Sequence, residues 1–241
     1  MPYVDPWFGP KQMPEPRQEY VAWLDIMGTE SMMRFSPDIA TTNIGKMIVA
    51  TIETDHPQGT EFYPVLDGIY FTHEEEGELK AIFFDIFLRF AQILIQRFEE
   101  DDTPGVHLSP VLRAGIAYGD VYHGVDFEDS AISDHHFSEA FLAGKPVAHA
   151  HYSEATAPPF GFNLHSSADA YAESGDLADF ARGYSNETRL IEWWQSENYG
   201  IRMKKALNAY FDYYNGRPVP EYPDEKIQQH RDQVNDYFPS N

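Results

Sequence analysis

Two aspartates stand where apolar runs end. Asp25 closes the run YVAWLDI, and Asp67 precedes Gly68 in FYPVLDGIYF. An Asp-Gly pair between two apolar runs is a strong signal for a β-hairpin turn, so Asp67 alone needs no further explanation. Asp25 does, because an unpaired carboxylate at the end of a buried strand is costly. Two facing carboxylates repel each other unless a cation lies between them, and Mg²⁺ and Mn²⁺ prefer such ligands. The pair therefore predicts a two-metal site suited to attack on phosphorus.

The elements that must position this pair are predicted from hydrophobic patterning. We expect strands over residues 20–26, on both sides of Asp67-Gly68, and over 111–119, 121–124 and 160–165, with a tight turn at Gly119-Asp120. Helices are expected over residues 29–53 in two segments, 79–98, 139–154 and in two stretches near the C-terminus. This order predicts an α+β, ferredoxin-like fold with an antiparallel-rich sheet and helices on one face. In such a sheet the first strand lies beside the hairpin, which brings Asp25 near Asp67.

Three segments are expected along the chain. Residues 1–19 form a proline-rich N-terminal arm, residues 20–165 the catalytic core, and residues 166–241 a mainly helical extension.

Composition excludes several kinds of protein. The chain has 241 residues, no cysteine and a formal charge of -22, with 17 Lys and Arg against 39 Asp and Glu. The missing cysteines exclude disulfides, thiolate zinc sites and cysteine nucleophiles. The acidic balance argues against a nucleic-acid polymer as partner, because phosphate backbones bind clustered cations. No apolar run is long enough for a membrane span and the first residues lack signal-peptide features, so we expect a cytoplasmic protein.

Four motifs in order carry a family resemblance: WLDIMG, FYPVLDGIYF, VLRAGIAYGDVYHG and LAGKPVAHAHYSE. Residues 20–165, which contain them, resemble the class III nucleotide cyclases, in particular the bacterial pyrimidine (uridylate) cyclases of Pycsar anti-phage systems. The resemblance implies a phosphorus-oxygen lyase that converts UTP to 3′,5′-cyclic UMP and pyrophosphate as a second messenger for a downstream effector. It also implies a head-to-tail homodimer. CTP stays open as the substrate.

The resemblance also implies roles for individual residues. Asp25 and Asp67 would hold two Mg²⁺ or Mn²⁺ ions, with the carbonyl of Ile26 as a further ligand. Tyr63, four residues before Asp67, would read the base, as tyrosine does in the uridylate cyclases. Ile26 and Gly28 would also contact the substrate.

The chain departs from the purine cyclases at two positions. Ala148 and Tyr152 align with the Asn and the transition-state Arg of those enzymes. Arg113 and Lys145 are the nearest motif-borne cations that could neutralise charge on phosphate, Arg113 as a catalytic residue and Lys145 as a substrate contact. Arg113 fits a structural ion pair equally well. The departures keep a second hypothesis open: a catalytically silent cyclase-like module that binds a nucleotide or dimerises.

Four histidines invite comparison with a zinc site: His135, His136, His149 and His151. Residues two apart on a helix do not share a face, so His149 and His151 are not expected to ligate one ion together. Solvated or locally bonded histidines are the favoured interpretation.

Overall fold

The structure is a computed structural model of the chain. It describes residues 14–100, 108–127, 138–169, 181–183, 188–194, 196–215 and 223–240. Most of the predicted N-terminal arm lies outside these residues. His135 and His136 also lie outside them, so the prediction for these two histidines is not tested.

The described chain contains both strands and helices, in mixed order. The strands are β1 (Arg17–Ile26), β2 (Glu61–Val65), β3 (Gly68–His73), β4 (Leu112–His123), β5 (Leu142–Gly144), β6 (Phe162–His165), β7 (Ala181–Gly183) and β8 (Thr188–Ile191). The helices are α1 (Thr29–Phe35), α2 (Pro37–Glu53), α3 (Glu76–Glu99), α6 (Lys145–Thr156), α7 (Ser166–Asp169), α8 (Glu197–Tyr214) and α9 (Asp224–Tyr237), with a 3₁₀ turn, η1 (Gly124–Asp126), after β4. None of the helices in the described ranges is both long and apolar enough to cross a membrane.

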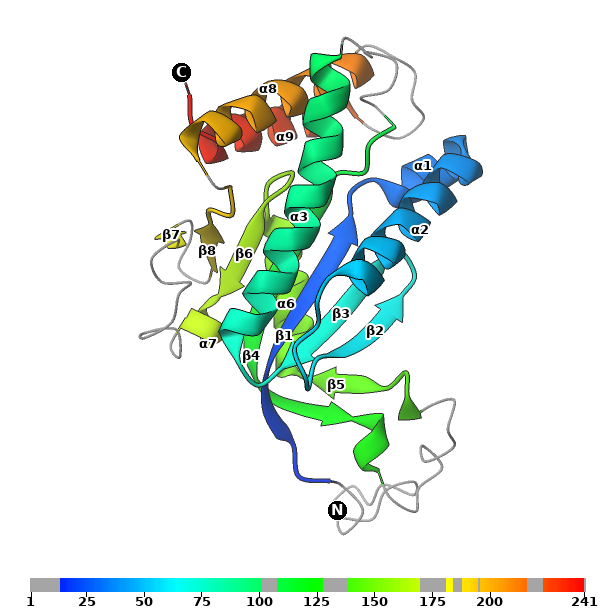
Figure 1. The fold of residues 1–241 in the computed structure, drawn as a ribbon, viewed down its shortest axis with the longest axis vertical. Coiled ribbons are helices and arrows are strands. Elements are labelled where there is room, and N and C mark those ends of the chain that lie inside the picture. The colour runs from blue at the N-terminus through cyan, green and yellow to red at the C-terminus, as the bar shows by residue number, and fades with distance from the viewer. Residues whose placement is uncertain are drawn as a thin grey trace.

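One sheet organises the fold (Figure 1). Its strand order is β2-β3-β1-β4-β6-β8-β7, with β5 paired to β4. The pairings are antiparallel except between β4 and β6, which run parallel. The predicted α+β class and antiparallel-rich sheet are confirmed.

Helices cover both faces of this sheet, whereas the sequence predicted them on one. Ala22 and Leu24 of β1 belong to the main core, which α3 completes, while Val21 and Trp23 pack with Ala150 of α6 on the other side. In Figure 1, α3 runs along the near face. The physical reason lies in β1, where successive residues alternate between faces. All four of these β1 residues are at most 5% exposed, so both faces need cover.

The third motif, VLRAGIAYGDVYHG, forms one continuous strand, β4, and not two. The predicted turn at Gly119-Asp120 is wrong, because β4 continues from Leu112 to His123. Gly119 has a φ of 147°, a conformation that glycine adopts without a Cβ clash and that lets the strand bend without ending. The helix expected over 139–154 begins only at Lys145, since the three residues before it pair with β4 as β5.

The chain beyond residue 165 joins the same sheet and core. β8 pairs with β6, and the indole of Trp193 donates a hydrogen bond to the Phe160 carbonyl at 2.7 Å. The hydroxyl of Tyr237, in α9, donates to the Ile191 carbonyl. Helices α8 and α9 lie across the upper end of the molecule in Figure 1. The described residues beyond 165 therefore pack against the strands and helices that precede them.

Candidate active site

The ladder between β1 and β3 brings the two aspartates together. Asp25 is the Cα partner of Gly68. Asp67 is the residue before Gly68, in the turn of the hairpin. Their carboxylates interact electrostatically, each charge opposing the other. A Cβ on Gly68 would lie 2.2 Å from the ring of Trp23, which occupies the space beside the pair. The predicted juxtaposition thus depends on a glycine at this position.

A third carboxylate reaches the pair from α6. Glu154 is 3% exposed and forms an ion pair of 2.7 Å with Nη2 of Arg113. Arg113 is itself the β4 partner of Asp25 in the ladder. Glu154 has no role predicted from the sequence, although it is the last residue of the fourth motif. One acidic residue on an expected helix does not indicate a site until the fold shows its neighbours.

Negative charge exceeds positive charge at this end of the sheet. Burial, then the charges of Glu154 and Asp67, raise the pKa of Asp25 to about 8, although Arg113 opposes the shift. Burial is also the main cause that raises the pKa of Glu154. Three carboxylates thus share one guanidinium, an environment that a divalent cation would relieve.

The donor set fits Mg²⁺ or Mn²⁺ in part. Asp25 and Asp67 offer carboxylate oxygens and Ile26 a carbonyl, all hard ligands of the kind these ions take. The carbonyl of Ile26 already accepts a hydrogen bond from the Thr29 hydroxyl at 2.8 Å, which leaves it one lone pair. Among the described residues, no group of three or more His, Cys, Asp and Glu converges on one ion position. Substrate oxygens and water would have to complete the coordination.

Gly28 lies at the turn that follows Asp25. It has a left-handed φ of 74° and caps α1, where its carbonyl accepts from the Met32 amide at 2.9 Å. It is exposed, beside the site, in a position that a substrate can approach.

Lys145 lies at the other end of β4. It follows Gly144, the partner of Val121, whereas Arg113 stands eight residues earlier on the same strand. At the usual rise of a strand this is roughly 25 Å along the sheet. Within one chain, the structure does not bring Lys145 to Asp25.

Tyr63 also lies away from the aspartates, in a buried polar network. It is 4% exposed, and its hydroxyl donates to Oε2 of Glu61 at 2.6 Å. Nδ1 of His123 lies 2.7 Å from the same hydroxyl, and Nε2 of His123 lies 2.9 Å from Oε2 of Glu19. Within one chain, both hydrogen-bonding partners of this hydroxyl are protein groups, so a base would have to displace one or use the remaining lone pair.

The neighbours of His123 favour a proton on both ring nitrogens. Nδ1 lies 3.0 Å from Oε2 of Glu61, a carboxylate oxygen that can only accept when ionised. Nε2 faces the carboxylate of Glu19, which only accepts. Burial alone would lower the pKa of His123, but its hydrogen bonds to the two glutamates, reinforced by their charges, raise it to about 9. His123 is therefore a buried imidazolium at neutral pH.

Arg17 closes the network. Its guanidinium donates to both carboxylate oxygens of Asp126 at 2.8 and 2.6 Å and to Glu61 at 2.8 Å. The network therefore ties the start of β1 and the strand β2 to the far end of β4 and η1.

The two positions that differ from the purine cyclases are both exposed. Ala148 and Tyr152 lie on α6, and Tyr152 is 52% exposed. The histidines of α6 have separate neighbours: His149 stacks on His165 with ring centroids 4.1 Å apart, and His151 lies 5.8 Å from the Trp23 ring.

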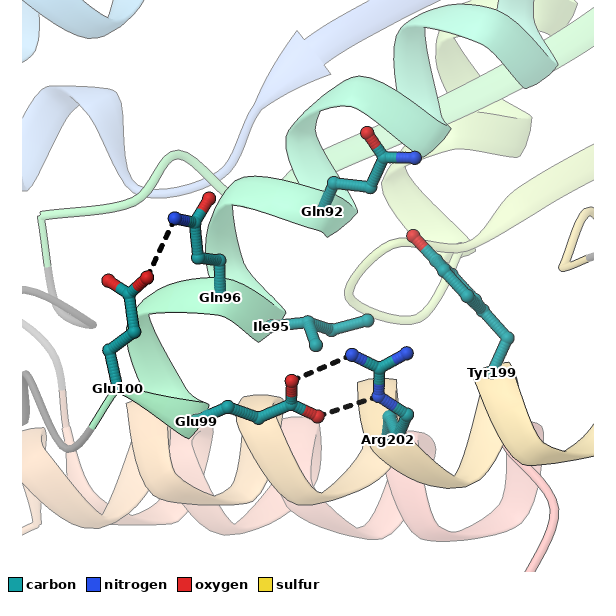
Figure 2. Close-up of a pocket in the computed structure, with 7 residues that line it drawn as sticks. All are labelled: Gln92, Ile95, Gln96, Glu99, Glu100, Tyr199 and Arg202. Atoms are coloured by element: carbon teal, nitrogen blue, oxygen red, sulfur yellow. Dashed lines mark hydrogen bonds and ion pairs between the residues drawn. The ribbon is translucent and has the colours of Figure 1, made fainter.

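A hollow of about 380 Å³ lies elsewhere, between the end of α3 and α8. In Figure 2, Arg202 donates two hydrogen bonds to Glu99, Tyr199 lies beside Arg202 on α8, and Gln92 lines the hollow from α3. None of the predicted site residues lines this hollow. The aspartate pair, and not this concavity, carries the chemistry that the sequence predicts.

Comparison with known proteins identifies the fold. No family model matches the sequence, and no curated protein matches it. Solved structures do match. A bacterial light-regulated adenylyl cyclase aligns over 81% of this chain and 100% of its own, with 16% identity and a TM-score of 0.56. Adenylate cyclases from Trypanosoma brucei align over 72% of this chain and 86% of theirs, with 14% identity and a TM-score of 0.51.

A fungal protein gives the same result. The guanylyl cyclase domain of the RhoGC fusion protein from Blastocladiella emersonii aligns over 75% of this chain and 97% of its own, with 13% identity and a TM-score of 0.52. The chain has the class III cyclase fold. At these identities the likeness concerns the fold, in which the β1–β3 ladder here places Asp25, on β1, close to Asp67 in the turn before β3.

Proposed function

We propose that this protein is a nucleotide cyclase, a phosphorus-oxygen lyase that forms a 3′,5′-cyclic nucleotide and pyrophosphate from a nucleoside triphosphate. One observation carries the proposal: on a cyclase fold, Asp25 and Asp67 meet at the end of adjacent strands in a region of excess negative charge. This arrangement supports two bound Mg²⁺ or Mn²⁺ ions.

The residues of the chain would act as follows. Asp25 and Asp67 would hold the ions, with the Ile26 carbonyl beside them, and Gly28 would let the triphosphate approach the backbone closely. The ions, when bound, lower the pKa of the ribose 3′-hydroxyl and neutralise the triphosphate. The 3′-oxygen attacks the α-phosphorus, a P–O bond forms, the bond to the β-phosphate bridging oxygen breaks, and pyrophosphate and a proton leave.

We further propose a pyrimidine substrate, UTP before CTP. The resemblance to uridylate cyclases supports this, through Tyr63 at four residues before Asp67. Its product, cyclic UMP, would act as a messenger in cytoplasmic anti-phage defence. Because Tyr63 is buried, a nucleotide base can contact it only if the network around it rearranges or a partner chain adds to the site.

A head-to-tail homodimer accompanies the proposal. Lys145 and Tyr63 lie away from Asp25 within one chain, so a second copy would have to bring them to the site. Leu66, beside Asp67, is 94% exposed with a φ of 54°, and Tyr152 is half-exposed on α6, which offers apolar contacts for such a copy. One crystal structure of the fungal guanylyl cyclase domain is a non-canonical dimer, and others are monomeric.

The test is a direct assay. Purified protein is incubated with Mn²⁺ and, separately, ATP, GTP, CTP or UTP, and products are identified by mass. Cyclic UMP is expected, and it should disappear in Asp25→Ala and in Asp67→Ala. Asp55→Ala, an exposed aspartate remote from the pair, is the matched control. Full turnover in either site variant would refute the metal assignment.

A second candidate function rests on the two departures from the purine cyclases. Ala148 and Tyr152 are exposed and neither can replace an arginine at the transition state. A cyclase-like module that binds a nucleotide without turnover would have these features. Mn²⁺-dependent nucleotide binding with no product from any of the four triphosphates would favour it.

A further inference from the structure

Arg113 has two carboxylates within its reach. Asp25 stands opposite it in the β1–β4 ladder, and Glu154 approaches it from α6. The guanidinium pairs with Glu154 at 2.7 Å and also donates to the Ala155 carbonyl at 3.4 Å. Within the described ranges, no ion pair joins Arg113 to Asp25. The guanidinium thus forms its ion pair with Glu154 at the end of α6, while its charge still acts on the nearby Asp25.

Tight packing sets the position of Glu154. A Cβ on Gly115 would lie 2.3 Å from the Ala150 carbonyl oxygen and 2.5 Å from the Glu154 amide nitrogen, so the backbones of β4 and α6 are in contact there. The side-chain amide of Asn163, on the next strand, donates to the Ser153 carbonyl at 3.0 Å. These contacts fix α6 where its glutamate meets Arg113.

We propose that Glu154 is a positioning residue that holds Arg113 away from Asp25 and so keeps the Asp25–Asp67 pair open to a divalent cation. The inference rests on the proposed function, because it concerns the metal site of the same reaction.

The reason is competition between cations. Arg113 is long enough to cross one strand spacing, and a guanidinium readily forms two parallel hydrogen bonds with a carboxylate. If it turned to Asp25, it would neutralise that carboxylate and fill the space of the ion. Glu154 prevents this because it is buried, and an ion pair away from water has few competing partners. The pair is therefore more than a structural tie between α6 and β4.

A double-mutant cycle tests the proposal. Mn²⁺ alone is titrated into the full chain, without nucleotide, and its Kd is measured by electron paramagnetic resonance for the wild type, Glu154→Gln, Arg113→Gln and the double variant. We expect Glu154→Gln to raise the Kd at least tenfold when Arg113 is present. The same change should alter the Kd less than threefold in the Arg113→Gln background, where no guanidinium can turn to Asp25.

Two further variants separate position from charge. Glu154→Asp keeps the negative charge but shortens the side chain, so it should weaken Mn²⁺ binding if position matters and leave it unchanged if only charge matters. Glu197→Gln, an exposed glutamate on α8, is the matched control and should leave the Kd unchanged. Melting temperatures measured on the same samples show whether each variant is folded, and Glu154→Asp provides the test if Glu154→Gln does not fold.

The outcomes separate this inference from the proposed function. An equal effect of Glu154→Gln in both backgrounds, or a wild-type Kd in Glu154→Asp, would overturn the positioning role while the metal site stands. Absence of Mn²⁺ binding by the wild type would overturn the metal site and the inference together.

Discussion

The hydroxyl of Tyr63 lies 2.7 Å from Nδ1 of His123, a residue 60 positions further along the chain. The same hydroxyl donates to Glu61, and His123 is fully buried between Glu61 and Glu19. A carboxylate lies within 3.0 Å of each ring nitrogen, which favours the imidazolium form of the histidine. A residue that the sequence assigns to substrate recognition is thus part of a charged network within its own chain.

This network predicts a loss of stability as the pH rises. The pKa of His123 is about 9 in the folded chain against 6.5 in an unfolded one, so its contribution is complete below pH 6.5 and is lost as the pH rises through 9. The contribution is about 3 kcal/mol by the usual conversion of a pKa shift. The pKa of Asp25, about 8, lies in the same pH window, so the comparison is made in an Asp25→Asn background. Urea unfolding of that background at pH 6 and pH 9.5 should show the difference, and adding His123→Gln should remove most of it.

The matched control is His56→Gln in the same background, since His56 is an exposed histidine. Its pH dependence should equal that of the Asp25→Asn background alone. Equal stability of that background at both pH values would contradict an imidazolium at position 123.

The acidic limit of the same network follows from Glu61. Hydrogen bonds from His123, then from Tyr63 and Arg17, lower the pKa of Glu61 to about 2, although burial opposes the shift. For a carboxyl with a lowered pKa, the stabilisation is present above its unfolded value of 4.5 and is lost as the pH falls through 2. Glu61→Gln should therefore flatten the fall in unfolding free energy between pH 4.5 and 2.5, measured by urea titration. An unchanged slope in this variant would contradict the low pKa.

Tyr63→Phe removes only the hydroxyl. The variant leaves Glu61 and His123 with one partner fewer in a buried place, so unfolding free energy should fall by about 1–2 kcal/mol. If Tyr63 also reads the base, the ratio of UTP to CTP turnover should change by more than the total activity does. A stability loss with an unchanged ratio would assign the tyrosine to the network alone.

What the sequence predicts well depends on local pattern. The helix at 79–98 has apolar residues at helical spacing and is found as α3, and the hairpin at Asp67-Gly68 follows from turn chemistry. Asp25 and Asp67 come together because the expected topology puts β1 beside β3. These features depend on the spacing of apolar residues, on local turn signals and on one assumed strand order.

The missed features depend on tertiary contacts. Glu154 gains its role from Arg113, 41 residues earlier (154 − 113). His123 gains its role from Tyr63 and Glu19, which are 60 and 104 residues away on other strands. Lys145 follows β5, which pairs with the end of β4 that is farther from Asp25. The sequence does not show this, because it does not show how long β4 is. The turn predicted at Gly119 failed because a glycine that bends a strand has the same sequence signal as one that ends it.

At pH 9, above the pKa of about 8 that burial gives Asp25, Asp25→Asn should make the metal-free protein more stable, and it should abolish turnover. It removes one of three carboxylates that share the guanidinium of Arg113, and relief of a buried, poorly compensated charge is typically worth roughly 1–4 kcal/mol. The melting temperature without metal should rise, and Mn²⁺ should no longer raise it further. A lower melting temperature in metal-free buffer would show that Asp25 stabilises the fold itself.

Gly68→Ala tests whether packing next to the aspartates is as tight as the structure indicates. The new Cβ would lie 2.2 Å from the Trp23 ring and 2.7 Å from the Leu24 carbonyl oxygen, so the hairpin must move away from β1. We expect a loss of about 1–3 kcal/mol in unfolding free energy, as for other overpacked sites, and weaker Mn²⁺ binding because Asp67 moves with the hairpin.

Gly45→Ala is the control for this substitution. Nothing lies within 4 Å of a Cβ at Gly45, which is in the middle of α2, so alanine there should be neutral or stabilise the helix by up to about 1 kcal/mol. The two variants make the same chemical change, and only the surroundings differ. If both had the same small effect on stability and on the Mn²⁺ Kd, Trp23 would not restrict the position of Asp67, and the close approach of β3 to β1 would not be what holds the two aspartates together.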